Sequence, residues 1–201
     1  GERLLQSRIA GLDWQQRYSV ARSFYTARDQ VPLALRQAAL DVLVKAGVEV
    51  TSTNEGIRVR RNGQPLESVD VDTDPFPGFP TDMQAQIMVL SALADGSSVI
   101  TENIFENRFM FASELVRMGA DIRIESHHAM IHGVKGFSGA QVTSPDLRGG
   151  AALVVAGLIA DGTTEVSAIH HIKRGYEQFV EKLQALGAHV EHATVPDPVI
   201  Y

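Results

Sequence analysis

Three segments of this chain share one ending, and this internal repeat constrains the fold more than any other feature of the sequence. In each segment an amphipathic stretch runs into a glycine and then into a short, β-rich stretch. Gly47, Gly119 and Gly187 hold this position, at spacings of 72 and 68 residues. Glycine at the end of an amphipathic stretch is typical of a helix C-terminus. We therefore expect three helix–glycine–strand connections.

The second and third copies of the repeat match over a longer stretch. Ala94-Asp95-Gly96 is followed 66 residues later by Ala160-Asp161-Gly162, and Arg108 is followed at the same spacing by Arg174. The unit is then a helix, an Asp-Gly turn, a strand, a loop with an arginine, a second helix, a glycine and a strand. Repeats of this length predict units that bury their faces against each other.

Helical patterns fit this frame. The apolar spacing over 176–186 predicts an amphipathic helix, and 151–159 is apolar on every side, which predicts a helix buried all round. The fold class expected is α/β (α+β), with central helices flanked by sheets. Residues 1–30 lack counterparts of the Asp-Gly turn and the apolar helix, so we expect them to pack poorly or to form a helix of their own. A tail is expected over 194–201.

Composition excludes several classes of protein. No run of 18 apolar residues is present, which argues against a membrane span, and the first residues do not resemble a signal peptide. The net charge of −6 argues weakly against a nucleic-acid partner. The chain contains no cysteine, which fits a reducing compartment, and we expect a cytoplasmic location.

Asp82 follows a proline-rich loop and is expected at the start of a helix over 83–94. Two interpretations are open. Aspartate at such a position is commonly an N-cap, which accepts hydrogen bonds from the first backbone amides of the helix. Alternatively, it is a general base at the mouth of a binding site.

Three arginines also stand out. Arg108 and Arg174 are expected to open two equivalent helices, where a cation works against the helix macrodipole, so an anion between them would explain the pattern. A surface arginine paired with a nearby glutamate is the simpler alternative. Arg148 precedes the apolar helix and follows Asp146, a candidate cap. Gly149 and Gly150 would let a ligand or another backbone approach closely.

The histidine pairs, His127-His128 and His170-His171, suggest a metal site at first. Adjacent residues in a strand point to opposite faces, however, and their spacing matches no ligand set that we expect for zinc. We predict no metal site.

Several motifs in order resemble one enzyme family. They are Phe79-Pro80-Thr81-Asp82-Met83-Gln84-Ala85-Gln86, 102–110 (Glu-Asn-Ile-Phe-Glu-Asn-Arg-Phe-Met), Arg117-Met118-Gly119-Ala120, Asp146-Leu147-Arg148 and Arg174-Gly175-Tyr176-Glu177. Together they look like the UDP-N-acetylglucosamine 1-carboxyvinyltransferases, and the resemblance runs from about Leu40 to Ala193. The shikimate-pathway enolpyruvyl transferases share the fold but resemble these motifs much less.

The resemblance implies a fold and a reaction. Members of the family have two similar domains, each an inside-out barrel of βαβαββ units around central helices, with the active site in the cleft between the domains. They add the 3-hydroxyl of UDP-N-acetylglucosamine to C2 of phosphoenolpyruvate and then eliminate phosphate, which is the first committed step of peptidoglycan synthesis. No cofactor and no metal are implied. Here the matching domain would span 31–193, about two and a half repeats.

The resemblance also implies roles for individual residues. Asp82 matches the favoured general base, which contacts the sugar hydroxyl, and Arg174 is the second residue that we assign to catalysis. Ile104 matches a backbone contact to the nucleotide sugar. Arg108, Arg148 and Arg174 match arginines around phosphoenolpyruvate, whose carboxylate and phosphate suit planar guanidinium groups. Thr81 and Phe105 complete the predicted substrate-binding set.

This sequence departs from the family pattern in one respect that matters for activity. Family members are roughly twice as long, and their other domain supplies a flexible loop with a general acid, which has no counterpart here. We therefore expect this chain to correspond to the C-terminal half. It would be a partial enzyme that needs the other domain, supplied by a separate chain if one exists, and inactive or very weakly active alone. The alternatives are a noncatalytic ligand-binding or regulatory fragment and a 3-phosphoshikimate 1-carboxyvinyltransferase-like protein.

Overall fold

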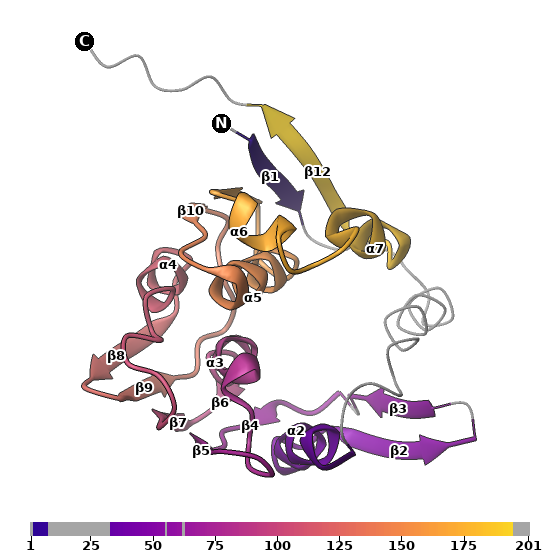
Figure 1. Ribbon diagram of the computed structural model, residues 1–201, viewed down its shortest axis with the longest axis vertical. Helices are drawn as coiled ribbons and strands as arrows, with labels where there is room; N and C mark the ends of the chain where they lie inside the picture. The colour runs from indigo at the N-terminus through magenta and orange to yellow at the C-terminus, as the bar shows by residue number, and fades with distance from the viewer. Residues whose placement is uncertain (1, 8–32, 55, 62, 195–201) are drawn as a thin grey trace. The chain divides into compact units, whose positions relative to one another are not determined.

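The computed structural model describes residues 2–7, 33–54, 56–61 and 63–194. The chain divides into two compact units (Figure 1). Unit 1 comprises residues 1–28, 110–119 and 136–201, and unit 2 comprises residues 29–109 and 120–135. Both units mix helices with strands, as the sequence predicts, and each is described below by itself.

Unit 2 is built around a four-stranded sheet with the order β5-β7-β9-β8. The strands are β5 (Val71–Thr73), β7 (Ser97–Glu102), β9 (His128–His132) and β8 (Asp121–Glu125). β5 runs parallel to β7, and the other neighbours are antiparallel. Helix α3 (Gln84–Ser91) packs on β7 and β9. Along β7 every second side chain is buried, so Ser98, Ile100 and Glu102 share the inner face.

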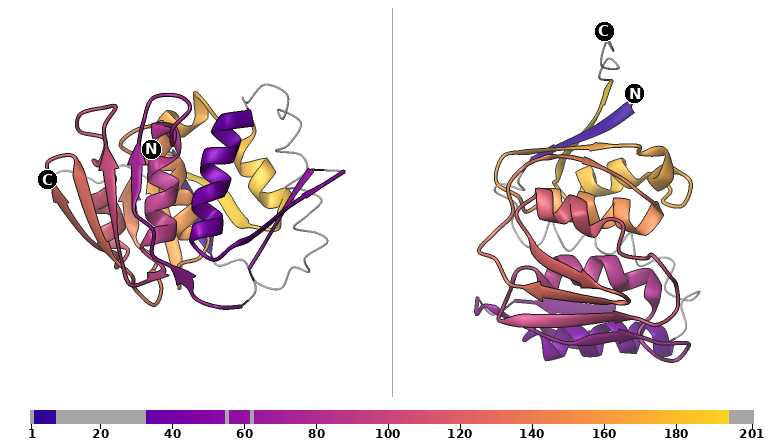
Figure 2. Two further views of the ribbon diagram at one scale, coloured as in Figure 1. Left: turned by 90° about the horizontal axis from the view of Figure 1, so that it is seen from below. Right: turned by 90° about the vertical axis from the view of Figure 1, so that its left-hand side faces the viewer.

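Most of the remaining elements of unit 2 precede this sheet in the chain. Helix α2 (Leu33–Lys45) leads into a hairpin of β2 (Glu49–Thr53) and β3 (Gly56–Arg60). The short strand β4 (Leu66–Glu67) then pairs in parallel with β6 (Ala94–Asp95). Helices α2 and α3 run with their axes nearly parallel (Figure 2).

Unit 1 has its own four-stranded sheet, with the order β10-β11-β1-β12. Its strands are β10 (Gln141–Thr143), β11 (Thr163–Ser167), β1 (Glu2–Ser7) and β12 (His189–Thr194). Helix α5 (Leu147–Gly157) packs on β11, β1 and two further helices, α4 (Ala112–Arg117) and α6 (His170–Lys173). Helix α7 (Phe179–Ala185) leads into β12.

The structure confirms the helix–glycine–strand repeat. Helices α2, α4 and α7 each end two residues before a glycine, and each is followed by a strand: β2, β8 and β12. The three glycines have left-handed φ values: 81° at Gly47, 99° at Gly119 and 83° at Gly187. The two Asp-Gly turns also match, with φ values of 99° at Gly96 and 93° at Gly162. These are conformations that a side chain disfavours, which explains the choice of glycine.

Two predictions about the ends of the chain need correction. Residues 2–7 form strand β1 in the middle of the unit 1 sheet, between β11 and β12, rather than packing poorly or forming a helix. The rest of the 1–30 segment lies outside the described residues. Strand β12 extends to Thr194, which pairs with Glu2, so the tail predicted over 194–201 does not begin at Thr194. Residues 195–201 lie outside the described residues.

Two helix predictions also need correction. Helix α5 is buried over most of its length, but Val155 is 39% exposed, so its surface is not enclosed all round. The helix predicted from Tyr176 begins only at Phe179, because Gln178 before it has a left-handed φ of 49°. In the part of the chain that the structure describes, no helix is both long and apolar enough to cross a membrane.

Candidate active site

Asp82 lies in a 3-10 turn, Thr81–Met83, that leads into α3. The N-cap positions of the turn and of α3 are Pro80 and Met83, and neither makes a side-chain capping hydrogen bond. The interpretation of Asp82 as an N-cap is therefore wrong, and the predicted helix start at Met83 is one residue early. The side chain is instead 58% exposed and makes an ion pair across unit 2.

The partner of Asp82 is Arg108, whose Nη2 atom lies 3.0 Å from Oδ1 of the carboxylate. The Arg108 guanidinium also lies 4.9 Å from the ring centroid of Phe105, within the range of a cation–π contact. We predicted that Arg108 opens a helix, and this is wrong: the next helix, α4, begins only at Ala112. The preceding Asn107 has a φ of 55°, so the chain turns there.

Glu102 is a residue of this region to which the sequence analysis gave no role. It ends β7, is only 3% exposed, and accepts three hydrogen bonds from neutral donors. Its Oε2 atom accepts from the Thr81 hydroxyl at 2.9 Å. Its Oε1 atom accepts from the backbone amides of Ile104 at 2.9 Å and Phe105 at 3.1 Å. A signal was available: a glutamate at an inward-facing position of a strand is rare unless its carboxylate has partners.

These contacts join the two segments of the candidate site twice, and the buried connection is the stronger. The exposed Asp82–Arg108 pair is worth about 0–1 kcal/mol, because water competes for both groups. Each hydrogen bond to a charged group is worth about 1.5–3 kcal/mol. The buried hydrogen bonds of Glu102 therefore contribute more to the connection between the 81–83 turn and the 103–105 loop than the ion pair does.

Arg148 lies in the first turn of α5 and is half-buried. The prediction that Asp146 caps this helix is confirmed: its Oδ1 atom accepts from the amides of Arg148 at 2.7 Å and Gly149 at 2.9 Å. The expectation for the two glycines needs refining. A Cβ atom on Gly149 would come within 2.8 Å of the Phe111 Cβ atom, and one on Gly150 would overlap the Ser144 hydroxyl. Protein side chains fill this space.

Arg174 does not open a helix. It is the C-cap of α6, where a cation is favourable, so the argument that it opposes a macrodipole is wrong. Gly175 follows, and a Cβ atom there would lie 2.6 Å from Leu147 Cδ2. Because Leu147 immediately precedes Arg148, the segments that carry the two arginines are in contact within unit 1.

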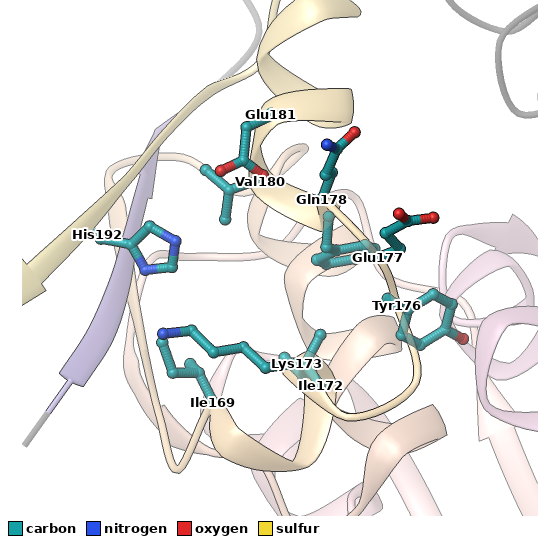
Figure 3. Close-up of a pocket in the computed structure, with 10 residues that line it drawn as sticks. Ile169, Ile172, Lys173, Tyr176, Glu177, Gln178, Val180, Glu181 and His192 are labelled. Carbon is teal, nitrogen blue, oxygen red and sulfur yellow. The ribbon is translucent and has the colours of Figure 1, made fainter.

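A surface pocket of about 480 Å³ lies nearby in unit 1, between the α6–α7 connection and β12 (Figure 3). Tyr176 and Glu177 of the arginine motif line it, together with Lys173 and His192. Asp82, Arg108, Arg148 and Arg174 do not line it, so the pocket does not coincide with the predicted site residues.

The described part of the chain contains no cluster of three or more histidine, aspartate or glutamate residues that could hold a metal ion. In each histidine pair the two rings pack against each other, with centroids 3.9 Å apart in His127-His128 and 4.1 Å apart in His170-His171. The second pair lies on helix α6 rather than on a strand, so the argument from opposite faces of a strand does not apply to it.

Each of the two units combines a four-stranded sheet with helices, and each carries some of the charged candidate residues. The family model of EPSP synthase (3-phosphoshikimate 1-carboxyvinyltransferase) matches residues 27–183, and the chain belongs to this family of enolpyruvyl transferases. The fold is accordingly the α/β fold of these enzymes.

Curated relatives and solved structures agree with this assignment. The UDP-N-acetylglucosamine 1-carboxyvinyltransferase of Afipia carboxidovorans is 55% identical over 157 residues, which cover 78% of this chain and 37% of the relative. The UDP-N-acetylglucosamine 1-carboxyvinyltransferase 2 of Carboxydothermus hydrogenoformans is 55% identical over 76% of this chain and 36% of its own. The chain thus spans little more than a third of these relatives' length.

Two solved structures extend the comparison to the fold. The enolpyruvyl transferase NikO from Streptomyces tendae matches with a TM-score of 0.74 and 31% identity, over 80% of this chain and 37% of its own. An EPSP synthase from Acinetobacter baumannii matches with a TM-score of 0.60 over 78% of this chain and 40% of its own. At 18% identity, this second likeness supports the fold alone.

Proposed function

We propose that this chain forms part of an enzyme that transfers the enolpyruvyl group of phosphoenolpyruvate to the 3-hydroxyl of UDP-N-acetylglucosamine. The observation that carries the proposal is the contact between Asp82 and Arg108. It brings a carboxylate and a guanidinium of the matching motifs within 3.0 Å of each other. The identity of 55% to relatives with this named activity supports the choice of sugar substrate.

The proposed chemistry needs a base and binding groups for an anion. The sugar hydroxyl loses a proton as its oxygen bonds to C2 of phosphoenolpyruvate and C3 gains a proton. Phosphate then leaves C2 as C3 loses a proton. Asp82 is the proposed acceptor of the hydroxyl proton, since its carboxylate is largely exposed and its position is restrained by Arg108.

Arg108 suits the anionic substrate. A guanidinium has five N–H donors, and the contact with Asp82 uses the Nη2 group alone. The remaining donors, held in one plane over Phe105, are proposed to bind the carboxylate or the phosphate. Arg148 and Arg174, which belong to unit 1, are each proposed to bind an anionic substrate group, and Arg174 also to stabilise the charge that develops during the reaction.

The hydrogen bonds of Glu102 limit what two other predicted residues can do. The Ile104 amide is already engaged, so its carbonyl is the backbone group proposed to meet the nucleotide sugar. The Thr81 hydroxyl donates its single hydrogen to Glu102, so toward a ligand it can only accept. Phe105, 52% exposed, offers an apolar surface beside both.

Three further points belong to the proposal. Residues 31–193, together with strand β1 (Glu2–Ser7) and Thr194 of the unit 1 sheet, are proposed to form an enolpyruvyl transferase domain with the inside-out barrel arrangement. The other groups needed for catalysis come from the part of the relatives that this chain does not match, on the same polypeptide or on a separate one. The proposed reaction would commit its product to peptidoglycan synthesis.

A chimera tests the proposal. Residues 27–183, which match the family model, replace the corresponding segment of the Afipia carboxidovorans relative. Phosphate release from phosphoenolpyruvate is then measured with UDP-N-acetylglucosamine or with shikimate 3-phosphate as acceptor. We expect phosphate release with UDP-N-acetylglucosamine as acceptor and none with shikimate 3-phosphate. Release only with shikimate 3-phosphate would favour the shikimate-type enzyme, and calorimetric binding of both substrates without release would favour the noncatalytic alternative. Either outcome would overturn the proposal.

A further inference from the structure

Glu102 occupies a position where a carboxylate is unusual. The alternation of β7 places it on the same inner face as Ile100, which is fully buried. None of the ion pairs found among the described residues involves Glu102, although a buried carboxylate is costly unless it is compensated. Its compensation is the set of three neutral donors described above.

Those donors come from two separate segments. The Thr81 hydroxyl belongs to the turn that carries Asp82, and it bonds one carboxylate oxygen. The amides of Ile104 and Phe105 belong to the loop that leads to Arg108, and both bond the other oxygen. Each oxygen of the Glu102 carboxylate therefore accepts hydrogen bonds from a different segment.

We infer that Glu102 is a positioning residue, which fixes the Asp82 turn against the 103–105 loop so that the base and the ligand-facing backbone keep one geometry. The expected effect on catalysis rests on the proposed function. That Glu102 fixes the two segments against each other does not depend on that function. A carboxylate suits this place because it has only acceptors, which matches three donors, whereas a glutamine would present its NH2 group to one of them.

Two other contacts support the same geometry. The Asn103 amide donates to the hydroxyl of Thr73, a fully buried residue of the neighbouring strand β5, at 2.9 Å. The Glu102 amide donates to the carbonyl of His127 at 2.8 Å. The start of the loop is thus fixed to the sheet, and the hydrogen bond from Thr81 to Glu102 connects the Asp82 turn to it.

The two sides of the carboxylate can be tested separately. Thr81→Val keeps the side-chain shape and removes the hydroxyl, so it releases the Asp82 turn and leaves the loop amides bonded to Oε1. Thr81→Ser keeps the hydroxyl and should restore the connection. Glu102→Ala removes both connections, and Thr101→Val, on the same strand but bonded to His128, is the matched control.

Amide hydrogen exchange on the full chain tests the structural content. In Glu102→Ala the amides of Ile104 and Phe105 should exchange at least about tenfold faster, because they lose their acceptor. In Thr81→Val these two amides should keep wild-type protection. Wild-type protection of both amides in Glu102→Ala would overturn the inference. If Glu102→Ala does not fold, the kinetic comparison of Thr81→Val with Thr81→Ser decides.

Kinetics in the chimera tests the consequence for catalysis. Thr81→Val should lower kcat about 10- to 100-fold, as misplacement of a reacting group does, with little change in the KM for phosphoenolpyruvate. Thr81→Ser should recover most of kcat, and Thr101→Val should stay at wild-type level. Equal kcat in Thr81→Val and wild type would overturn the inference. An inactive wild-type chimera would instead refute the proposed function, while the exchange result still decides whether Glu102 holds the loop.

Discussion

The Arg108 guanidinium lies 3.0 Å from the Asp82 carboxylate, although 26 residues separate them in the chain. The two side chains differ in exposure, 18% for Arg108 and 58% for Asp82, so the carboxylate is the more open to a ligand. Since an exposed ion pair contributes little to folding, changes here should alter chemistry far more than stability.

Asp82→Asn separates these two effects. In the chimera we expect kcat for phosphate release to fall about 10²- to 10⁴-fold, the usual contribution of a general base. The free energy of unfolding of the chain should change by less than about 1 kcal/mol, because only an exposed pair is lost. Asp121→Asn, an exposed carboxylate on β8, is the control and should keep wild-type activity. Near-normal kcat in Asp82→Asn would refute the role of Asp82 as base.

Arg108→Lys tests anion binding. Lysine keeps the charge but loses the planar group over Phe105 and the paired donors. We expect the KM for phosphoenolpyruvate to rise about 10- to 100-fold, which corresponds to the loss of about 1.5–3 kcal/mol of charged hydrogen bonding. Arg123→Lys, whose side chain is 73% exposed and bonded to Glu125, is the control. An unchanged KM in Arg108→Lys would show that the anion binds elsewhere.

The repeat could be predicted from sequence because glycine has a physical reason to stand at each helix end. Its left-handed φ at Gly47, Gly119 and Gly187 is a local property of the backbone, and local properties leave a local pattern. The position of β1 could not be predicted in this way. Its pairing with β12 joins Glu2 to Thr194, and nothing in the sequence near either residue records so distant a partner.

Gly119→Ala should measure the cost of this backbone conformation. A Cβ atom on Gly119 would meet no other atom within 4 Å, so any loss of stability comes from the φ of 99°. We expect the free energy of unfolding to fall by about 1–2 kcal/mol, measured by denaturant titration. Gly136→Ala is the matched control, since it also has open space but no left-handed φ, and it should be neutral or slightly stabilising. Equal effects of the two changes would contradict this explanation.

The sequence motifs supplied the candidate site residues, but the local contacts of these residues could not be predicted from them. The motifs contain Asp82 and Arg108, yet the sequence could not show that their side chains meet, because that contact depends on the packing of two distant segments. The macrodipole argument for Arg174 failed because α6 is a separate four-residue helix that ends just before it. Glu102 carried a signal in its inward-facing position, but its partners are brought to it by the turn at Thr81 and the loop at Ile104.

Gly150→Ala tests whether close packing at the start of α5 holds the Arg148 segment. The added methyl group would overlap the Ser144 hydroxyl and lie 2.9 Å from Ile172 Cγ1, in a buried position. We expect a loss of about 1–3 kcal/mol in the free energy of unfolding, as for other overpacked cores. Ser144→Gly removes the overlapping atoms, so the double variant should lose less than the sum of the two single changes, with a coupling of about 0.5–3 kcal/mol. Strict additivity would mean that the Ile172 side chain, rather than Ser144, limits the space at Gly150.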